Sequence, residues 1–419
     1  MTRRSPWDGG GAVCQAMTLR AAQQPRWPDP ALAAAVTDTL SRMPPVVTAD
    51  EAAGLLARLA WVAEGRGHVV TSGDCAETFA GSTPAHIAGN LRVLGELAAA
   101  MRGPRDLPVV RIGRLAGQYA KPRTAAADET GVPSYRGDAI NAAHPSGPAR
   151  MPDPRRMLRA YAVAVAARDC ARSLSGGPGG RADPVGDPVY LGHEALLLDY
   201  ECGLLRHGTG GEVYGSSGHF LWVGERTRQP GGAHLAFAAA VANPVGVKLG
   251  PAATPAEAAH HALFLNPGRL PGRLTLITRL GARAIGHRLP GLIDAVQRTR
   301  VPVVWQCDPM HGNTVLTSTG LKTRHLGDVL AEVRTFFDIH RRMGSHPGGV
   351  HVEATGDDVT ECAGAEVTAD DVPKRYWSAC DPRLNPAQVR ELAELLRELA
   401  GADLITAAGS TPMTRLRPG

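Results

Sequence analysis

The chain has 419 residues, 43% of them hydrophobic and 20% charged, which is enough chain and enough apolar surface for a large buried core. Its formal net charge is only +5 and no basic run reaches five residues, so the composition argues against a nucleic-acid partner and fits an enzyme for anionic metabolites. Seven cysteines without a Cys-x-x-Cys pair exclude a zinc knuckle and a secreted disulfide framework; without a long apolar run or an export signal, we expect no membrane span and a cytoplasmic location.

Residues 1–66 predict an N-terminal arm followed by a helical extension. The first 30 residues are rich in Gly, Pro, Arg and Gln, which is typical of a poorly ordered arm. Through 31–66, Leu and Val recur at steps of three and four residues, and Pro44-Pro45 interrupts them. This pattern predicts two helices separated by the proline pair.

From residue 67, short apolar runs alternate with Ala- and Leu-rich helical stretches, such as 85–101, 156–173, 233–242 and 325–343. Such alternation predicts a parallel sheet, and eight strands are the number that closes a barrel. We therefore expect an α/β fold, a (β/α)8 TIM barrel over 67–404, although an open sheet fits the pattern equally well. The expected strands are 68–73, 107–113, 194–200, 219–224, 244–249, 274–280, 301–307 and 349–354.

Two further segments are predicted around this barrel. Residues 174–188 are rich in Gly and Pro and predict a loop without any core-forming pattern. Residues 386–404 predict an amphipathic helix, after which 405–419 form a tail.

Cationic side chains follow several predicted strands, where barrel enzymes assemble their active sites. So many cations at one barrel mouth indicate more than one phosphate or carboxylate group in the ligands. Pairing of single cations with neighbouring carboxylates such as Glu225 is the alternative. The cations are Arg114, Lys121, Arg123, Arg226, Lys248 and Arg279.

A second group at the same strand ends contains one thiol, one imidazole and two carboxylates: Cys75, His311, Glu353 and Asp381. Such a mixed set suits a divalent transition metal. The four residues are far apart in sequence, so their spacing alone does not assign them. A buried structural Cys and a hydrogen-bonded His remain the alternatives.

Longer motifs decide between these alternatives. They are Gly-Asp-Cys-Ala-Glu-Thr-Phe (73–79), Arg-Leu-Ala-Gly-Gln-Tyr-Ala-Lys-Pro-Arg-Thr (114–124), Trp-Val-Gly-Glu-Arg-Thr-Arg (222–228), Asn-Pro-Val-Gly-Val-Lys (243–248), Trp-Gln-Cys-Asp-Pro-Met-His (305–311), His-Val-Glu (351–353) and Ala-Cys-Asp-Pro-Arg (379–383). From about residue 23 to residue 385, the chain resembles the class II (plant-type) 3-deoxy-D-arabino-heptulosonate 7-phosphate (DAHP) synthases, in the order of that family.

The resemblance implies condensation of phosphoenolpyruvate with erythrose 4-phosphate, the first step of the shikimate pathway, in a TIM barrel with an N-terminal extension. It implies one divalent metal ion on Cys75, His311, Glu353 and Asp381, with Mn2+ expected first and Co2+, Fe2+ or Zn2+ as alternatives. Phosphoenolpyruvate would bind Arg114, Glu225, Arg226, Lys248 and Arg279, and erythrose 4-phosphate would bind Lys121, Pro122, Arg123 and Thr124. Lys121 is a candidate proton donor to the new alkoxide, and Glu225 a candidate for orienting the attacking water.

Two features depart from the family pattern. Thr71-Ser72 stand where Gln-Gly is usual, beside a predicted metal ligand. The Gly/Pro-rich loop at 174–188 replaces a helical insertion that serves effector binding and assembly in long members of the family. We therefore expect weak feedback inhibition by aromatic amino acids, a place in secondary metabolism and a homodimer.

Three questions remain open at the level of sequence. An amino-DAHP synthase, which takes an amino- or imino-erythrose 4-phosphate, would carry nearly the same motifs. A non-catalytic barrel with a regulatory role is a remote alternative, because no predicted ligand is missing. A disulfide between Cys75 and Cys380, which would eject the metal on oxidation, is a further hypothesis.

Overall fold

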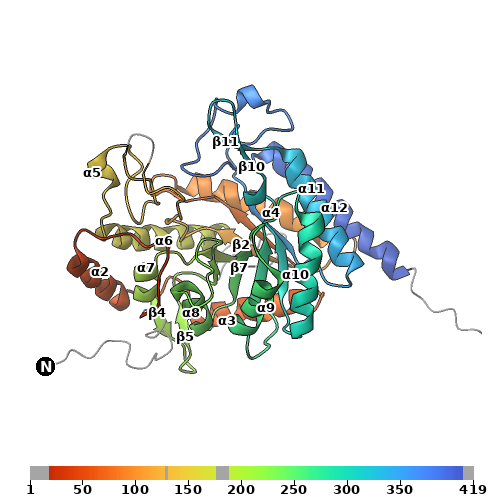
Figure 1. Ribbon diagram of the computed structural model, residues 1–419, viewed down its shortest axis with the longest axis horizontal. Helices are drawn as coiled ribbons and strands as arrows, with labels where there is room; N and C mark the ends of the chain where they lie inside the picture. Colours follow the sequence, from red (N-terminus) through yellow and green to blue (C-terminus); the bar gives the residue numbers. More distant parts are fainter. Residues whose placement is uncertain (1–17, 128–130, 176–187, 409–419) are drawn as a thin grey trace, which may run out of the picture.

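Eight parallel strands close into a barrel at the centre of the molecule (Figure 1), in the spatial order β1-β12-β9-β8-β7-β6-β3-β2. The computed structural model describes residues 18–127, 131–175 and 188–408. The predicted α/β barrel is confirmed. Its strands are β1 (His68–Gly73), β2 (Val109–Arg114), β3 (Val189–Glu194), β6 (Phe220–Val223), β7 (Val245–Leu249), β8 (Leu274–Thr278), β9 (Val304–Cys307) and β12 (Gly349–Glu353).

The third strand was predicted at the wrong place. Strand β3 ends at Glu194, and the predicted strand 194–200 instead runs into helix α7 (Leu198–Gly203). The apolar run that suggested a strand is buried against helices, whereas β3 itself contains Gly192 and a histidine and therefore looks polar. Gly192 is needed there, because a Cβ atom would lie only 2.9 Å from the carbonyl oxygen of Phe220 on the neighbouring strand.

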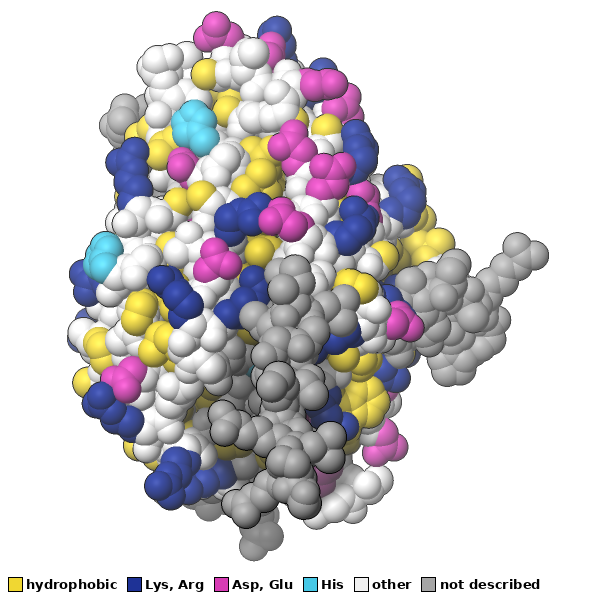
Figure 2. All heavy atoms as spheres, turned by 90° about the vertical axis from the view of Figure 1, so that its right-hand side faces the viewer, with side chains coloured by type: hydrophobic (Ala, Val, Ile, Leu, Met, Phe, Trp, Pro, Cys, Tyr) yellow, Lys and Arg dark blue, Asp and Glu magenta, His cyan; other side chains and the backbone are white. Residues whose placement is uncertain are grey.

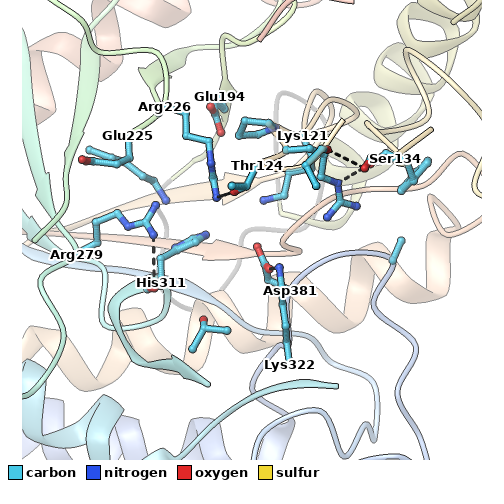
Figure 3. Close-up of a pocket in the computed structure, with 18 of the residues that line it drawn as sticks. Lys121, Thr124, Ser134, Glu194, Glu225, Arg226, Arg279, His311, Lys322 and Asp381 are labelled. Carbon is cyan, nitrogen blue, oxygen red and sulfur yellow. Dashed lines mark hydrogen bonds and ion pairs between the residues drawn. The ribbon is translucent and has the colours of Figure 1, made fainter. Parts of the chain in front are cut away.

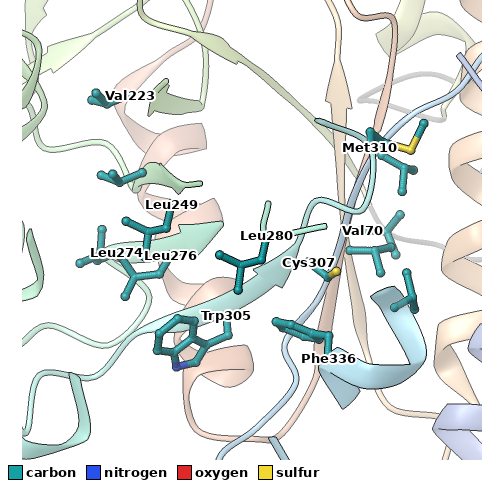
Figure 4. Packing of buried hydrophobic residues seen from close by; sticks show 14 of the residues in the cluster. Val70, Val223, Leu249, Leu274, Leu276, Leu280, Trp305, Cys307, Met310 and Phe336 are labelled. Atoms are coloured by element: carbon teal, nitrogen blue, oxygen red, sulfur yellow. The ribbon is translucent and has the colours of Figure 1, made fainter. Parts of the chain in front are cut away.

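Helices surround the barrel and bury its outer face. Large aliphatic and aromatic side chains fill the layer between strands and helices (Figure 4), including Leu276 and Cys307 from strands and Phe336 from a helix. This burial is the main stabilising contribution to the fold. The surrounding helices are α4 (Pro84–Arg102), α6 (Arg155–Leu174), α8 (Ala233–Ala240), α9 (Pro255–Leu265), α10 (Ile285–Thr299), α11 (Leu326–Arg342) and α12 (Pro386–Ala408).

The N-terminal extension closes one end of the barrel. It consists of α2 (Pro30–Arg42) and α3 (Ala49–Ala63), and α3 lies beneath the strands (Figure 1). Leu55 and Leu59 of α3 share one buried cluster with the barrel side chains Ile112 and Ile277. The loop before β8 approaches α3 closely, because a Cβ on Gly272 would lie 2.4 Å from the Leu56 carbonyl oxygen.

The opposite end, where the strands terminate, carries a short hairpin of β10 (Thr314–Leu316) and β11 (Lys322–Arg324) (Figure 1). It follows the 3-10 turn η1 (His311–Asn313) after β9. A second hairpin, β4 (Leu205–His207) with β5 (Val213–Gly215), and the short helix α5 (Gly147–Arg150) complete the connections. Because α3 packs against one end of the barrel, the opposite end is where a ligand can reach the strand ends.

The outer surface bears interspersed acidic and basic side chains on the face shown in Figure 2. Within the described ranges, every helix is too short or too polar to cross a membrane. Helix α12 continues to Ala408, past the predicted end at 404. Most of the predicted N-terminal arm, of the 174–188 loop and of the C-terminal tail lies outside the described residues.

Candidate active site

A cavity of about 580 Å³ opens at the carboxyl ends of the strands (Figure 3). Residues from seven of the barrel strands, or from the loops that follow them, contribute to its wall, as in other barrel enzymes. All nine residues predicted to bind the two substrates line it: Arg114, Lys121, Pro122, Arg123, Thr124, Glu225, Arg226, Lys248 and Arg279.

Three of the four predicted metal ligands meet at the base of this cavity. Ligand atoms of Cys75, Glu353 and Asp381 all lie within 4.8 Å of one another. The fourth residue, His311, places Nε2 3.1 Å from a carboxylate oxygen of Glu353. One thiol, one imidazole and two carboxylates are therefore adjacent, and these donors fit a divalent transition metal.

Basic residues hold the two carboxylates of this cluster. Arg114 donates to one oxygen of Glu353 at 3.1 Å, and Arg324 donates to the other at 2.9 Å. Lys322 lies 2.7 Å from Asp381. Both Lys322 and Arg324 belong to β11, so the hairpin above the barrel mouth orients one carboxylate at the end of strand β12 and another in the segment between β12 and α12.

Asp308 connects the predicted metal ligands to the cationic residues of the cavity, because it contacts both His311 and Lys248. Its carboxylate lies 2.7 Å from Nδ1 of His311 and 2.7 Å from Nζ of Lys248. A carboxylate on Nδ1 fixes the proton there and leaves Nε2 free to face a metal ion. Burial would raise the pKa of Asp308, but His311 and Lys248 lower it well below its usual range.

The protonation of the cluster follows from burial and charge together. Burial lowers the pKa of His311, although Asp308 and Glu353 act in the opposite direction. Burial alone would raise the pKa of Glu353, yet His311, Arg324 and Lys121 bring it well below its usual range. The side chains therefore present a neutral imidazole and an ionised carboxylate, which are the forms that bind metals.

Three of the predicted phosphoenolpyruvate residues, Glu225, Arg226 and Arg279, lie together on one side of the cavity in Figure 3. Arg279 donates to the His311 carbonyl oxygen at 3.4 Å, and Arg226 donates to Thr124 at 3.0 Å. The carboxylate of Glu225 is held in place by two hydrogen bonds, which it accepts from Arg228 at 2.9 Å and from the Gly250 amide at 2.6 Å. These contacts fix the direction of two cations before any ligand binds.

The predicted sugar-phosphate segment, 121–124, lies on the other side. The buried carboxylate of Glu77 shapes the loop that leads to it by accepting the amide hydrogens of three successive residues, 116–118. Nζ of Lys121 comes within 3.8 Å of Glu353, and Arg123 donates to Sγ of Cys380 at 3.2 Å. The segment thus reaches from the cavity wall to the metal cluster.

The thiols of Cys75 and Cys380 are both free; Sγ of Cys75 donates to a carboxylate oxygen of Asp381 at 3.4 Å, and Sγ of Cys380 accepts from Arg123 at 3.2 Å. Burial, with Cys380 and Glu353, raises the pKa of the Cys75 thiol well above its usual range. The proposed disulfide between the two residues remains a hypothesis.

Sequence reasoning gave no role to several residues that the structure brings to the site. Lys322, Arg150 and Glu194 line the cavity, Arg324 holds Glu353, and Asp308 orients His311. Asp308 and Glu194 follow or end strands, so their positions carried a signal. Lys322 and Arg324 come from a hairpin that has no strand pattern of its own.

Comparison with known proteins gives one consistent result. A family model described as the class-II DAHP synthetase family matches residues 14–187 and 183–397. The chain is 43% identical to phospho-2-dehydro-3-deoxyheptonate aldolase AroG of Mycolicibacterium smegmatis, over 92% of this chain and 93% of that protein. It is 42% identical to the phospho-2-dehydro-3-deoxyheptonate aldolase of Streptomyces coelicolor, over 91% and 95% of the two chains.

A solved structure supports the fold alone. The phospho-2-dehydro-3-deoxyheptonate aldolase of Francisella tularensis aligns with a TM-score of 0.53 at 13% identity, over 87% of this chain and 96% of the other. The motifs, the barrel and these relatives agree: the chain belongs to the class-II DAHP synthetase family, the enzymes that join phosphoenolpyruvate to erythrose 4-phosphate.

Proposed function

We propose that this chain performs the condensation at a single divalent metal ion held by Cys75, His311, Glu353 and Asp381. The observation that carries the proposal is one cavity in which these four donors adjoin a wall of cations. Both substrates are anions, and bringing two anions together in water is unfavourable. Preorganised cations offset that repulsion and hold the reacting carbons close.

The metal proposal depends on donor chemistry. Carboxylates favour hard ions and the Cys75 thiolate favours softer ones, so the donors fit several divalent transition metals. The family resemblance makes Mn2+ the first candidate, with Co2+, Fe2+ and Zn2+ as alternatives. When bound, the ion would polarise the aldehyde oxygen of the sugar phosphate as a Lewis acid. A divalent cation also favours the thiolate form of Cys75, which is otherwise suppressed in this buried position.

On the phosphoenolpyruvate side, Arg226, Lys248 and Arg279 would neutralise phosphate and carboxylate charge, together with Arg114. They would present carbon 3 of phosphoenolpyruvate to carbon 1 of the aldehyde. Water then adds at carbon 2, and phosphate leaves from the resulting hemiketal phosphate. Glu225 would orient that water; its carboxylate is fixed by Arg228, which supports a positioning role.

On the aldehyde side, Arg123 and Thr124 would bind the phosphate of the sugar, with Pro122 shaping the turn. Lys121 would donate a proton to the oxygen that becomes an alkoxide. Burial lowers the pKa of Lys121, but Cys75, Glu353 and Asp381 outweigh it and raise the pKa, so the ammonium form is present. Its position 3.8 Å from Glu353 supports this assignment.

The decisive experiment measures metal content and condensation before and after chelation. We expect activity to fall to background when the metal is removed and to return when Mn2+ is added. Offering erythrose 4-phosphate and its amino analogue side by side distinguishes DAHP from amino-DAHP synthesis. Activity that is unchanged in metal-free protein would refute the metal proposal, and Lys121→Met or Glu225→Gln with unchanged turnover would remove that residue from the chemistry.

A further inference from the structure

Glu194 is an acidic side chain in the cavity wall to which the proposed chemistry gives no task. It ends strand β3 and lines the cavity, with 8% of its surface exposed. Figure 3 shows it between Arg226 and the segment that carries Lys121 and Thr124. Its backbone amide donates to the side-chain oxygen of Gln118 at 3.0 Å, which ties it to the same loop.

Unlike the other acids of the site, Glu194 makes no ion pair within the part of the chain that the structure describes. Glu225 is paired with Arg228, and Asp381 is paired with Lys322. Oε1 of Glu194 is buried and has no hydrogen-bond partner among the described residues. A buried carboxylate oxygen without a partner costs free energy, and because the side chain lines the cavity, a donor from a ligand is expected to supply the missing hydrogen bond.

The barrel makes room for this carboxylate. Oε1 of Glu194 lies against Gly224, where a Cβ atom would be only 2.1 Å away. Any larger residue at Gly224 would therefore displace the side chain from the wall. Gly224 also directly precedes Glu225 and Arg226, so the carboxylate lies beside the proposed phosphoenolpyruvate site.

The chemistry of the two substrates decides what Glu194 can bind. Phosphoenolpyruvate at neutral pH carries a carboxylate and a phosphate and offers essentially only acceptors, so an unpaired carboxylate would repel it. The sugar phosphate carries two hydroxyl groups, on carbons 2 and 3, and each can donate a hydrogen bond. Only the sugar among the two substrates can therefore satisfy Glu194.

We propose that Glu194 accepts a hydrogen bond from a hydroxyl group on the carbon chain of the sugar phosphate and thereby selects hydroxylated aldehydes. The inference rests on the proposed function and adds a specificity determinant to it. A hydrogen bond to a charged acceptor contributes enough to change kcat/KM by about 10- to 100-fold.

The test compares erythrose 4-phosphate with its 2-deoxy and 3-deoxy analogues in the wild type, Glu194→Gln and Glu194→Ala. In the wild type, we expect one analogue to lose about 10- to 100-fold in kcat/KM. In Glu194→Ala, erythrose 4-phosphate should lose a similar factor, while the disfavoured analogue should be nearly unaffected. Glu194→Gln retains the shape and one acceptor oxygen and should lie between the two.

Controls separate this role from a general one. The KM for phosphoenolpyruvate and the affinity for Mn2+ should not change in either variant, and Glu391→Gln, on the exposed face of α12, should behave as wild type. If Glu194→Ala slows erythrose 4-phosphate and both analogues by the same factor, the residue serves the water or the fold and the proposal is refuted. A wild-type protein without activity toward erythrose 4-phosphate would instead refute the proposed function and, with it, this inference.

Discussion

Replacing Asp308 by Asn tests whether this carboxylate orients the predicted metal ligand His311 and neutralises Lys248. The wild-type carboxylate is fully buried and lies 2.7 Å both from Nδ1 of His311 and from Nζ of Lys248. One oxygen, Oδ2, accepts from both partners, and the other, Oδ1, accepts from the backbone amides of Met310 and His311 at 3.1 and 3.3 Å, so either orientation of an amide turns its NH2 group toward hydrogen-bond donors. His311 then loses the group that fixes its tautomer, and Lys248 loses its counter-charge.

The expected magnitude follows from those two losses. Removing a hydrogen-bonded carboxylate behind a metal-binding histidine lowers metal affinity by about 10- to 100-fold, or about 1.4–2.7 kcal/mol. Leaving the Lys248 ammonium buried without a partner lowers the stability of the ligand-free protein by about 3–5 kcal/mol. Phosphoenolpyruvate should restore part of that stability, because its anionic groups replace the missing charge near Lys248.

Titration calorimetry with Mn2+ and denaturant unfolding with and without phosphoenolpyruvate measure both effects. Asp294→Asn is the matched control, because its pair with Arg298 is exposed at the surface and should contribute less than about 1 kcal/mol. Mn2+ affinity within twofold of wild type in a folded Asp308→Asn protein would refute the proposed role of Asp308.

Three further outcomes are expected. Arg324→Met leaves a buried oxygen of Glu353 without its 2.9 Å donor and should lower the free energy of unfolding by about 3–5 kcal/mol, against less than about 1 kcal/mol for the exposed Arg334→Met. Burial lowers the pKa of His340 from 6.5 to about 3, so its stabilising contribution is complete above pH 6.5 and is lost as the pH falls; between pH 7 and pH 5 the loss is about 2 kcal/mol. Between pH 7 and pH 5, the unfolding free energy of His340→Leu should decrease by about 2 kcal/mol less than that of the wild type. The same decrease in both proteins would contradict the lowered pKa of His340. Because the loop at 174–188 is short, titration with tryptophan or phenylalanine should leave the initial rate within twofold, and strong inhibition would contradict the expected weak feedback control.

The sequence predicts this fold well where a strand carries a cluster of buried aliphatic residues. Strands β1 and β7 lie at the predicted places because each has such a cluster, Val69-Val70 in β1 and Val245, Val247 and Leu249 in β7, although both strands also bury polar side chains. Strand β3 fails this rule, since Gly192 packs against the neighbouring strand and the more apolar residues after Glu194 enter a helix. The error therefore comes from close backbone packing, which a single sequence does not reveal.

The candidate site divides in a similar way. Residues at strand ends, such as Lys248 and Glu353, could be found from their positions, and the motifs suggested their roles. Arg324 could not be found so, because its importance depends on a hairpin folding back over a distant carboxylate. The same holds for Glu194, whose significance lies in the missing partner rather than in its place in a motif.

The arrangement of charge explains how the protein can hold so many buried ions without its ligands. Arg114 and Lys121, assigned to the substrates, lie 3.1 and 3.8 Å from Glu353, assigned to the metal, and Lys322 lies 2.7 Å from Asp381. Each half of the site thus neutralises the other while both are empty, which reduces the cost of burying charge. A metal ion held by Glu353 and Asp381 would weaken their attraction for Arg114, Lys121 and Lys322 and leave these cations available for phosphate and carboxylate groups. By linkage, bound anionic substrate would favour the metal to the same degree, and the two halves would then act as one site rather than two neighbouring ones.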